Sequence, residues 1–173
     1  MVSRLLAAFA TASMFWPASA WSADPEAAKD VAQRFCAARL AYDETATRAL
    51  LSRGLLAAIE RAEERNDVLA KGNPHEKPPL GDGIPYAAYP DAPDTCKAQD
   101  PATVDGVNVI GVRYGFKVGD SGWTDRLVLV DADGRVAIDD VLFPQFTTDS
   151  EQYGLRRALL ATFDQWDDEM DAD

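Results

Sequence analysis

Length, composition and charge already restrict what this chain can be. Its 173 residues suit one domain with a single hydrophobic core. With 29 acidic against 17 basic residues, the formal net charge is −12, which repels phosphate backbones and anionic lipid surfaces. We therefore expect no nucleic-acid or lipid partner, while basic proteins, cationic ligands and neutral small molecules remain possible partners.

The N-terminus has the pattern of a secretory signal peptide. Arg4 precedes an apolar run over residues 5–16, and Ala18, Ser19 and Ala20 supply a small-residue cleavage site. The apolar run is too short to span a bilayer, and no later segment is long enough. We predict a signal peptide over residues 1–20 and one exported domain over residues 21–173, periplasmic or secreted, with no membrane insertion of the mature form.

Helical patterns fill the first part of this domain. Asp24 and Pro25 suit the cap and first turn of a helix. Its apolar stripe, at helical spacing, is Val31, Phe35, Ala38 and Tyr42. A short second helix is expected over residues 45–51, and Ser52 can cap a third that ends at Gly72. The apolar face of the third helix is Leu55, Leu56, Ile59, Ala62 and Leu69.

Residues 72–103 form a proline-rich segment with seven of the ten prolines. This density excludes long helices and central strands, so we expect an extended loop with at most one or two short edge strands. Loops of this length are often functional, although a loop that only wraps the core is the reading we favour. Ile84, Tyr86 and Tyr89 could anchor it.

Cys36 and Cys96 are the only two cysteines. In an exported protein such a pair favours a disulfide over a metal or catalytic site. The bond would pin the proline-rich loop to the first helix.

Residues 107–143 predict three antiparallel strands joined by tight turns at Asp120-Ser121 and Asp133-Gly134. Two-residue loops would pair Val118 with Trp123, Tyr114 with Leu127, Val112 with Leu129, Leu129 with Ile138, and Leu127 with Asp140. The predicted apolar face is Val112, Tyr114, Phe116, Val118, Trp123, Leu127, Leu129, Val136, Ile138 and Leu142. The predicted opposite face is Arg113, Lys117, Arg126 and Asp139 around Val128, Val130 and Val141.

Asp125 and Asp140 are anomalous in this register, since both fall on the apolar face as diagonal neighbours. A buried carboxyl near Tyr114 could act as a general acid or base, so these three residues are the candidate catalytic group. The alternative, which we favour, is that both carboxylates lie at the sheet rim and meet an arginine from the helices: Arg39, Arg53 or Arg157.

The C-terminal pattern predicts a last helix with its apolar face at Leu155, Leu159, Phe163 and Trp166, followed by an acidic tail over residues 167–173. The tail is expected to be solvated, with docking to a basic partner as the alternative. No metal or cofactor site is expected. His75 has no companion ligands, Asp131-Ala132-Asp133-Gly134 lacks calcium-loop spacing, and the protease-like Gly119-Asp120-Ser121-Gly122 falls at a hairpin turn.

Helices followed by an antiparallel meander predict an α+β domain in which N-terminal helices pack on a curved, cone-like sheet, with a C-terminal helix. The chain resembles the nuclear transport factor two-like, cystatin-like cone superfamily, and within it an exported bacterial branch of unknown function. The likeness lies in residues 31–35 (VAQRF), 83–86 (GIPY), 91–93 (DAP) and 136–141 (VAIDDV). It implies a cavity between sheet and helices. It does not carry over catalytic roles for Tyr114 or Asp140, because no ketosteroid isomerase motif matches.

These observations favour an exported, non-enzymatic module that binds a small apolar ligand or a protein partner near Tyr86, Tyr89, Tyr114 and Trp123. One alternative is a periplasmic immunity or inhibitor protein against a basic secreted toxin, steered by the acidic charge. The other is a small enzyme that uses the pocket carboxylates. The oligomeric state does not follow from the sequence.

Overall fold

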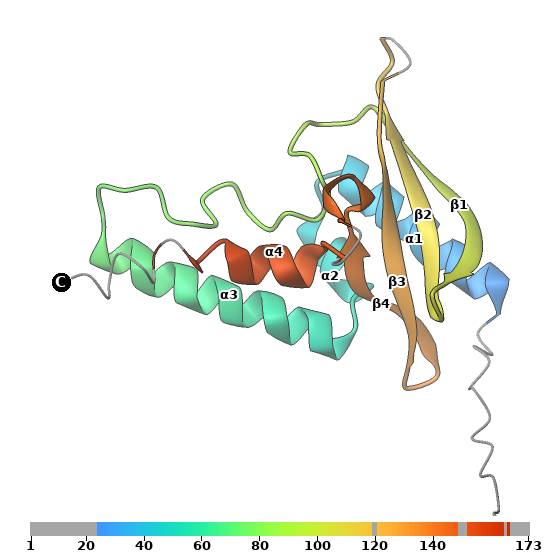
Figure 1. Cartoon of the computed structure of the whole chain (residues 1–173), viewed down its shortest axis with the longest axis horizontal. Helices are drawn as coiled ribbons and strands as arrows, with labels where there is room; N and C mark the ends of the chain where they lie inside the picture. The colour runs from blue at the N-terminus through green and yellow to red at the C-terminus, as the bar shows by residue number, and fades with distance from the viewer. Residues whose placement is uncertain (1–23, 119–120, 149–151, 165, 167–173) are drawn as a thin grey trace, which may run out of the picture.

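The computed structural model describes residues 24–118, 121–148, 152–164 and 166. The predicted signal peptide and the predicted acidic tail lie outside these residues. The elements in chain order are α1 (Pro25–Leu40), α2 (Glu44–Ala49), α3 (Arg53–Gly72), β1 (Thr95–Val104), β2 (Val107–Gly115), β3 (Thr124–Ala132), β4 (Arg135–Leu142), the 3-10 turn η1 (Pro144–Phe146) and α4 (Leu155–Ala161). N-terminal helices, a curved antiparallel sheet and a C-terminal helix confirm the predicted α+β class (Figure 1).

The helix starts follow the capping residues in the sequence. Asp24 accepts a hydrogen bond from the Glu26 N–H of α1, and Ser52 accepts one from the Leu55 N–H of α3, each at 3.0 Å. Asp43, which we had not identified as a cap, starts α2 in the same way. This short helix therefore begins one residue earlier than predicted and ends at Ala49.

The sheet has the order β1-β2-β3-β4, so it is a meander of four antiparallel strands. The predicted loop segment 72–103 ends in an edge strand of the kind that we allowed for. This strand, β1 (Thr95–Val104), is longer than expected and adds a fourth strand to the three predicted. Proline is compatible with this edge strand because Pro101 lies where the pairing with β2 is interrupted, between Ala98 and Pro101.

The register between β2 and β3 also differs from the prediction. Leu127 pairs with Ile110 rather than Tyr114, a shift of four residues (114 − 110). The reversal begins earlier because Gly122 has a φ of +155° and packs against the chain at Tyr114, where a Cβ would lie 2.2 Å from the carbonyl oxygen. An even shift preserves the buried face, but it leaves Val118 88% exposed.

The β3–β4 hairpin has the predicted turn, with positive φ at both Asp133 and Gly134. Leu129 pairs with Ile138 as predicted. An irregularity between Val128 and Leu129 then changes the partner of Leu127 from the predicted Asp140 to Val141. The prediction was therefore wrong for the end of β4.

The consequence is an exchange of faces at the end of β4. Val141 is fully buried in the core, whereas Asp140 pairs with Val128 and Leu142 with Arg126 on the opposite face.

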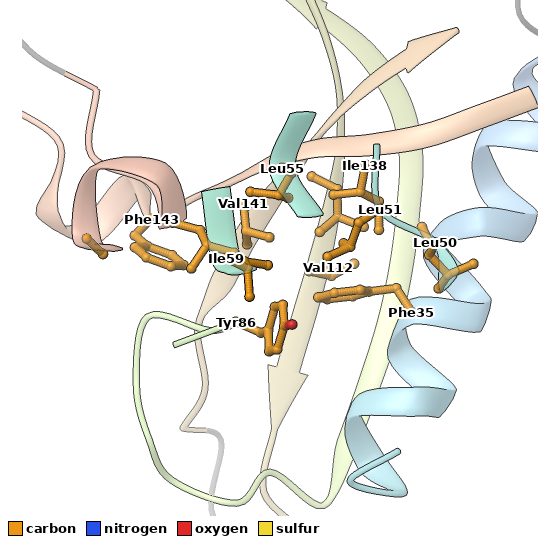
Figure 2. Close-up of a cluster of buried hydrophobic side chains, with 14 of the residues drawn as sticks. Phe35, Leu50, Leu51, Leu55, Ile59, Tyr86, Val112, Ile138, Val141 and Phe143 are labelled. Atoms are coloured by element: carbon orange, nitrogen blue, oxygen red, sulfur yellow. The ribbon is translucent and has the colours of Figure 1, made fainter. Parts of the chain in front are cut away.

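The core lies between the sheet and the helices. Figure 2 shows side chains from α1, α3 and the strands pointing toward one another, among them Phe35, Leu55, Ile59, Val112, Ile138 and Val141. Tyr86, from the proline-rich segment, is buried in the same cluster. α4 runs alongside α3 (Figure 1).

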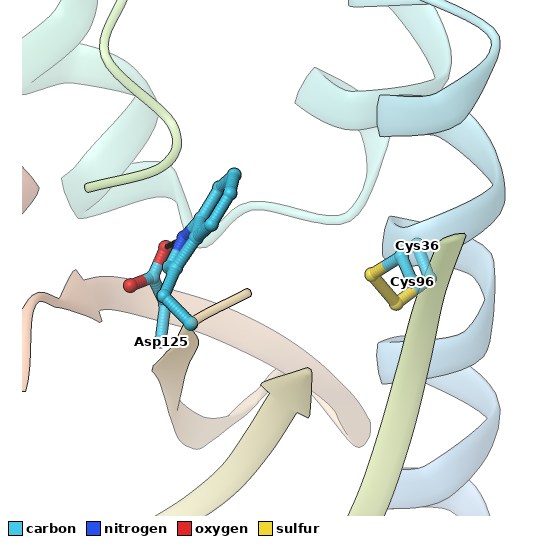
Figure 3. Close-up of a disulfide and its surroundings, with 4 residues drawn as sticks. Cys36, Cys96 and Asp125 are labelled. Carbon is cyan, nitrogen blue, oxygen red and sulfur yellow. Dashed lines mark hydrogen bonds between the residues drawn. A yellow bond between two sulfur atoms is a disulfide. The ribbon is translucent and has the colours of Figure 1, made fainter. Parts of the chain in front are cut away.

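The two sides of the sheet end differently. On the β4 side, the Ser52 N–H donates to the Ile138 carbonyl at 2.8 Å, and Leu142 forms a bridge with Gly154. On the β1 side, no further strand is present among the described residues. The predicted disulfide is confirmed there: Cys36 of α1 is bonded to Cys96 of β1 (Figure 3). It therefore fastens the edge strand, rather than a loop, to the first helix.

Candidate functional site

The segment 82–93, here called the pocket loop, crosses over the sheet between α3 and β1. Tyr86 holds its middle, because the ring is 1% exposed and the hydroxyl donates to Glu44 Oε1 at 2.8 Å. The Ala88 N–H donates to Asp125 Oδ2 at 3.0 Å, which ties the loop to β3. The loop is therefore held by specific polar contacts although it has no regular secondary structure.

Beneath this loop lies a cavity of about 310 Å³. Its wall is the pocket loop itself together with Arg39, Tyr42 and Tyr114. The lining is therefore mainly tyrosine, proline and alanine, with Arg39 as its only cation. A volume of this size suits a small organic molecule.

Tyr114 forms part of the inner wall of the cavity. Its ring is 1% exposed and stacks on Trp123 with centroids 4.8 Å apart. Within the described part of the chain, its buried hydroxyl has no hydrogen-bond partner. Burial raises the pKa of this phenol, the charge of Asp125 raises it further, and the charge of Arg39 opposes both effects.

Arg39 lies half-buried in the last turn of α1. Its guanidinium carbon stands over the Tyr86 ring, 5.0 Å from the centroid. No hydrogen bond or ion pair of this side chain is found among the residues that the structure describes. From the sequence we expected Arg39 only as a partner for a carboxylate, so its place in the cavity wall was missed.

Asp125, a candidate catalytic residue, is 0% exposed. It accepts hydrogen bonds from three neutral donors: Trp123 Nε1 at 3.1 Å, the Ala88 N–H at 3.0 Å and Gln145 Nε2 at 3.2 Å. Burial raises the pKa of this carboxyl, and the three donors oppose the increase. Asp125 is not among the residues that line the cavity. It joins the pocket loop, β3 and η1.

Asp140, the other candidate carboxylate, serves a different purpose. Its Oδ1 accepts from the Val141 N–H at 2.8 Å and from the Arg156 N–H at 3.1 Å. Arg156 lies in the first turn of α4. The residue at the N-cap of this helix is Gly154, which has no side chain that could accept a hydrogen bond. Asp140 thus satisfies a free N–H at the start of α4. Burial raises the pKa of Asp140, while these N–H groups oppose the increase.

The prediction that Asp125 and Asp140 are neighbours on the apolar face is therefore wrong. Asp125 pairs with Val112 on the buried face of the sheet, and Asp140 pairs with Val128 on the other face. The expected side-chain partner from Arg39, Arg53 or Arg157 is replaced by N–H donors of the backbone and of Trp123 and Gln145.

The four residues expected near a binding site do gather. Tyr86, Tyr89 and Tyr114 line the cavity, and Trp123 stacks on Tyr114 from the neighbouring strand. Tyr89 also meets Trp123 edge to face at 5.3 Å, where a second depression of about 430 Å³ shares Tyr89 and Asp91 with the cavity.

Comparison of the chain with models of known protein families, with curated proteins and with solved structures finds no match. Among the described residues, no helix is both long and apolar enough to cross a membrane. The same residues contain no cluster of histidine, cysteine and carboxylate side chains that could hold a metal ion. The class that fold and site define is an α+β domain with a loop-covered aromatic cavity.

Proposed function

We propose that this protein is an exported, non-enzymatic binding module that takes a small, largely apolar ligand into the cavity beneath the pocket loop. The observation that carries this proposal is the cavity itself, because tyrosine, proline and alanine side chains surround about 310 Å³ of space. Concave sites lined mostly by apolar and aromatic groups are typical of small-molecule binding.

Two further observations support export and binding. A disulfide between Cys36 and Cys96 fits the oxidising conditions of a periplasmic or extracellular location, in agreement with the predicted signal peptide. Asp125 and Asp140, the carboxylates considered for catalysis, are engaged in holding the loop and α4. The arrangement of helices over a curved sheet also supports a proposed relationship to the nuclear transport factor two-like superfamily.

The test is binding of a neutral probe to the purified exported protein. We expect 3-phenylpropanol to give saturation-transfer NMR signals with the wild type. Ala92→Trp places a large ring in the cavity wall and should abolish these signals. Ala161→Trp is the matched control, because Ala161 is exposed on α4 and does not line the cavity. Equal signals from the two variants, or none from the wild type, would refute the proposal.

A further inference from the structure

Two residues of the cavity wall carry polar groups that make no hydrogen bond or ion pair with the described residues: the Arg39 guanidinium and the Tyr114 hydroxyl. The other polar side chains of the wall are either exposed to solvent, as Tyr42, Tyr89 and Asp91 are, or have a partner. The Tyr86 hydroxyl donates to Glu44 at 2.8 Å, and Asp82 forms an ion pair with Lys77 at 2.6 Å. Among the described lining residues, Arg39 and Tyr114 are therefore the polar side chains that are at least half-buried and lack a hydrogen bond or ion pair.

The Tyr114 hydroxyl is unusual among the described residues, and Arg39 differs from other basic side chains without an ion pair in that it lines the cavity. A buried hydroxyl without a hydrogen bond costs free energy, so native structures contain few of them. The chain has 29 acidic residues for 17 basic ones, and carboxylate partners for a cation are abundant. Arg39 nevertheless contacts a ring rather than a carboxylate. The cost of leaving the Tyr114 hydroxyl unpaired is offset if a ligand supplies the acceptor, and the same ligand can pair with Arg39.

The surroundings hold Arg39 in position. Its guanidinium packs on the Tyr86 ring, the Tyr86 hydroxyl is fixed by Glu44, and Glu44 is paired with Arg48 at 2.7 Å. The charge of Arg39 acts on the phenols of both Tyr86 and Tyr114. Because both side chains line the same cavity, one anionic group on a ligand could meet the Arg39 guanidinium and the Tyr114 hydroxyl together.

We infer that the cavity selects a small carboxylic acid, with its carboxylate bound by Arg39 and by the Tyr114 hydroxyl and its apolar body enclosed by the pocket loop. This inference rests on the proposed function. A planar carboxylate matches the two parallel N–H groups of a guanidinium, and Tyr114 donates its proton as a third hydrogen bond. Because the Tyr114 hydroxyl is sealed from solvent, a ligand reaches it only if the pocket loop moves outward.

The rim of the cavity carries negative charge, so binding of a cation is the alternative against which carboxylate binding can be tested. Asp91 lines the cavity and is exposed, and Asp82 lines it but is paired with Lys77. A cationic ligand would use Asp91 and the tyrosine faces instead, with Arg39 repelling it. The net charge of −12 repels anions from the rest of the surface, so carboxylate binding would report Arg39 specifically.

The experiment is calorimetric titration of the purified protein with three probes of the same carbon skeleton: 3-phenylpropionate, 3-phenylpropanol and 3-phenylpropylamine. We expect the acid to bind about tenfold or more tightly than the alcohol, and the amine to bind most weakly. Arg39→Gln should remove the difference between acid and alcohol without abolishing binding of the alcohol. Tyr114→Phe should weaken the acid roughly threefold to tenfold and leave the alcohol closer to the wild type.

Arg34→Gln is the matched control, because Arg34 lies on the same helix, outside the cavity wall, with Asp30 at 3.5 Å as its partner. It should keep the full preference for the acid. If Arg39→Gln does not fold, Arg39→Lys keeps the charge but loses the paired N–H geometry, and it should give an intermediate preference.

The outcomes separate this inference from the proposed function. Equal affinity for acid and alcohol overturns the carboxylate selection and leaves the binding module intact. Tightest binding of the amine overturns the selection in favour of a cation site. No binding of any probe overturns both proposals.

Discussion

Tyr114→Phe should make the protein more stable, although it removes a polar group from a buried tyrosine. The Tyr114 hydroxyl is buried and has no partner among the described residues, so it loses its hydration on folding without gaining a hydrogen bond. Removing such a group relieves about 1–3 kcal/mol. With a urea m-value of about 2 kcal/mol per molar, the unfolding midpoint should rise by roughly 0.5–1.5 M.

Tyr86→Phe makes the same chemical change with the opposite expected sign. The Tyr86 ring is as buried as that of Tyr114, but its hydroxyl donates to Glu44 at 2.8 Å. Losing that bond should lower stability by about 1 kcal/mol. Urea unfolding followed by tryptophan fluorescence and circular dichroism measures both variants. A destabilised Tyr114→Phe at unchanged m-value would refute the reasoning, since it would mean that the hydroxyl is satisfied in solution.

Three further predictions concern the contacts that hold the site. Replacing both Cys36 and Cys96 by alanine should lower stability by about 4 kcal/mol, because the bond closes a loop with a sequence separation of 60; equal urea midpoints for oxidised and reduced protein would contradict this. Burial raises the pKa of Asp125 above its ordinary 3.8, so the folded state binds the carboxyl proton more tightly than the unfolded chain does. Ionisation of Asp125 therefore lowers the free energy of unfolding as the pH rises from about 4 through the raised pKa. In Asp125→Asn the fall in stability over that pH interval should be smaller, by about 1.4 kcal/mol per unit of pKa difference. Urea unfolding at a series of pH values measures this, and an unchanged profile would show that Asp125 does not cause the fall. Asp140→Ala should lower stability by about 1 kcal/mol, as loss of a helix cap does, and leave probe affinity in the cavity unchanged; reduced probe affinity in a folded variant would restore a site role for Asp140.

Local signals predicted much of the fold. Asp24 and Ser52 start helices where their side chains can accept from free N–H groups, and Asp133-Gly134 makes the expected turn. These features depend on neighbours within a few residues, so the sequence displays them directly. The cysteine pairing followed from there being only two cysteines in a chain with a predicted export signal.

Other features depend on contacts that no short window contains. The β2–β3 register is set by the close approach of Gly122 to Tyr114, and the faces of Asp140 and Val141 by an irregularity at Val128. An irregularity adds one residue to one strand, and regular alternation cannot reveal it. The prediction of an acidic pair failed for this reason.

The tyrosines of the site could be anticipated because aromatic residues in a proline-rich loop are conspicuous. Arg39 could not, since its role arises from its position at the end of α1 beneath a loop more than 40 residues later in the chain. Its lack of an ion-pair partner is visible only in three dimensions.

The two borders of the sheet have different consequences for self-association. Along β4, backbone groups are occupied by the segments at Leu51 and Gly154, so little is left for another molecule to pair with. Along β1, Pro101 offers no N–H, the pairing irregularity bends the strand, and the bond to α1 restrains it covalently. The molecule is thereby a poor template for intermolecular strand addition, which disfavours amyloid-like aggregation.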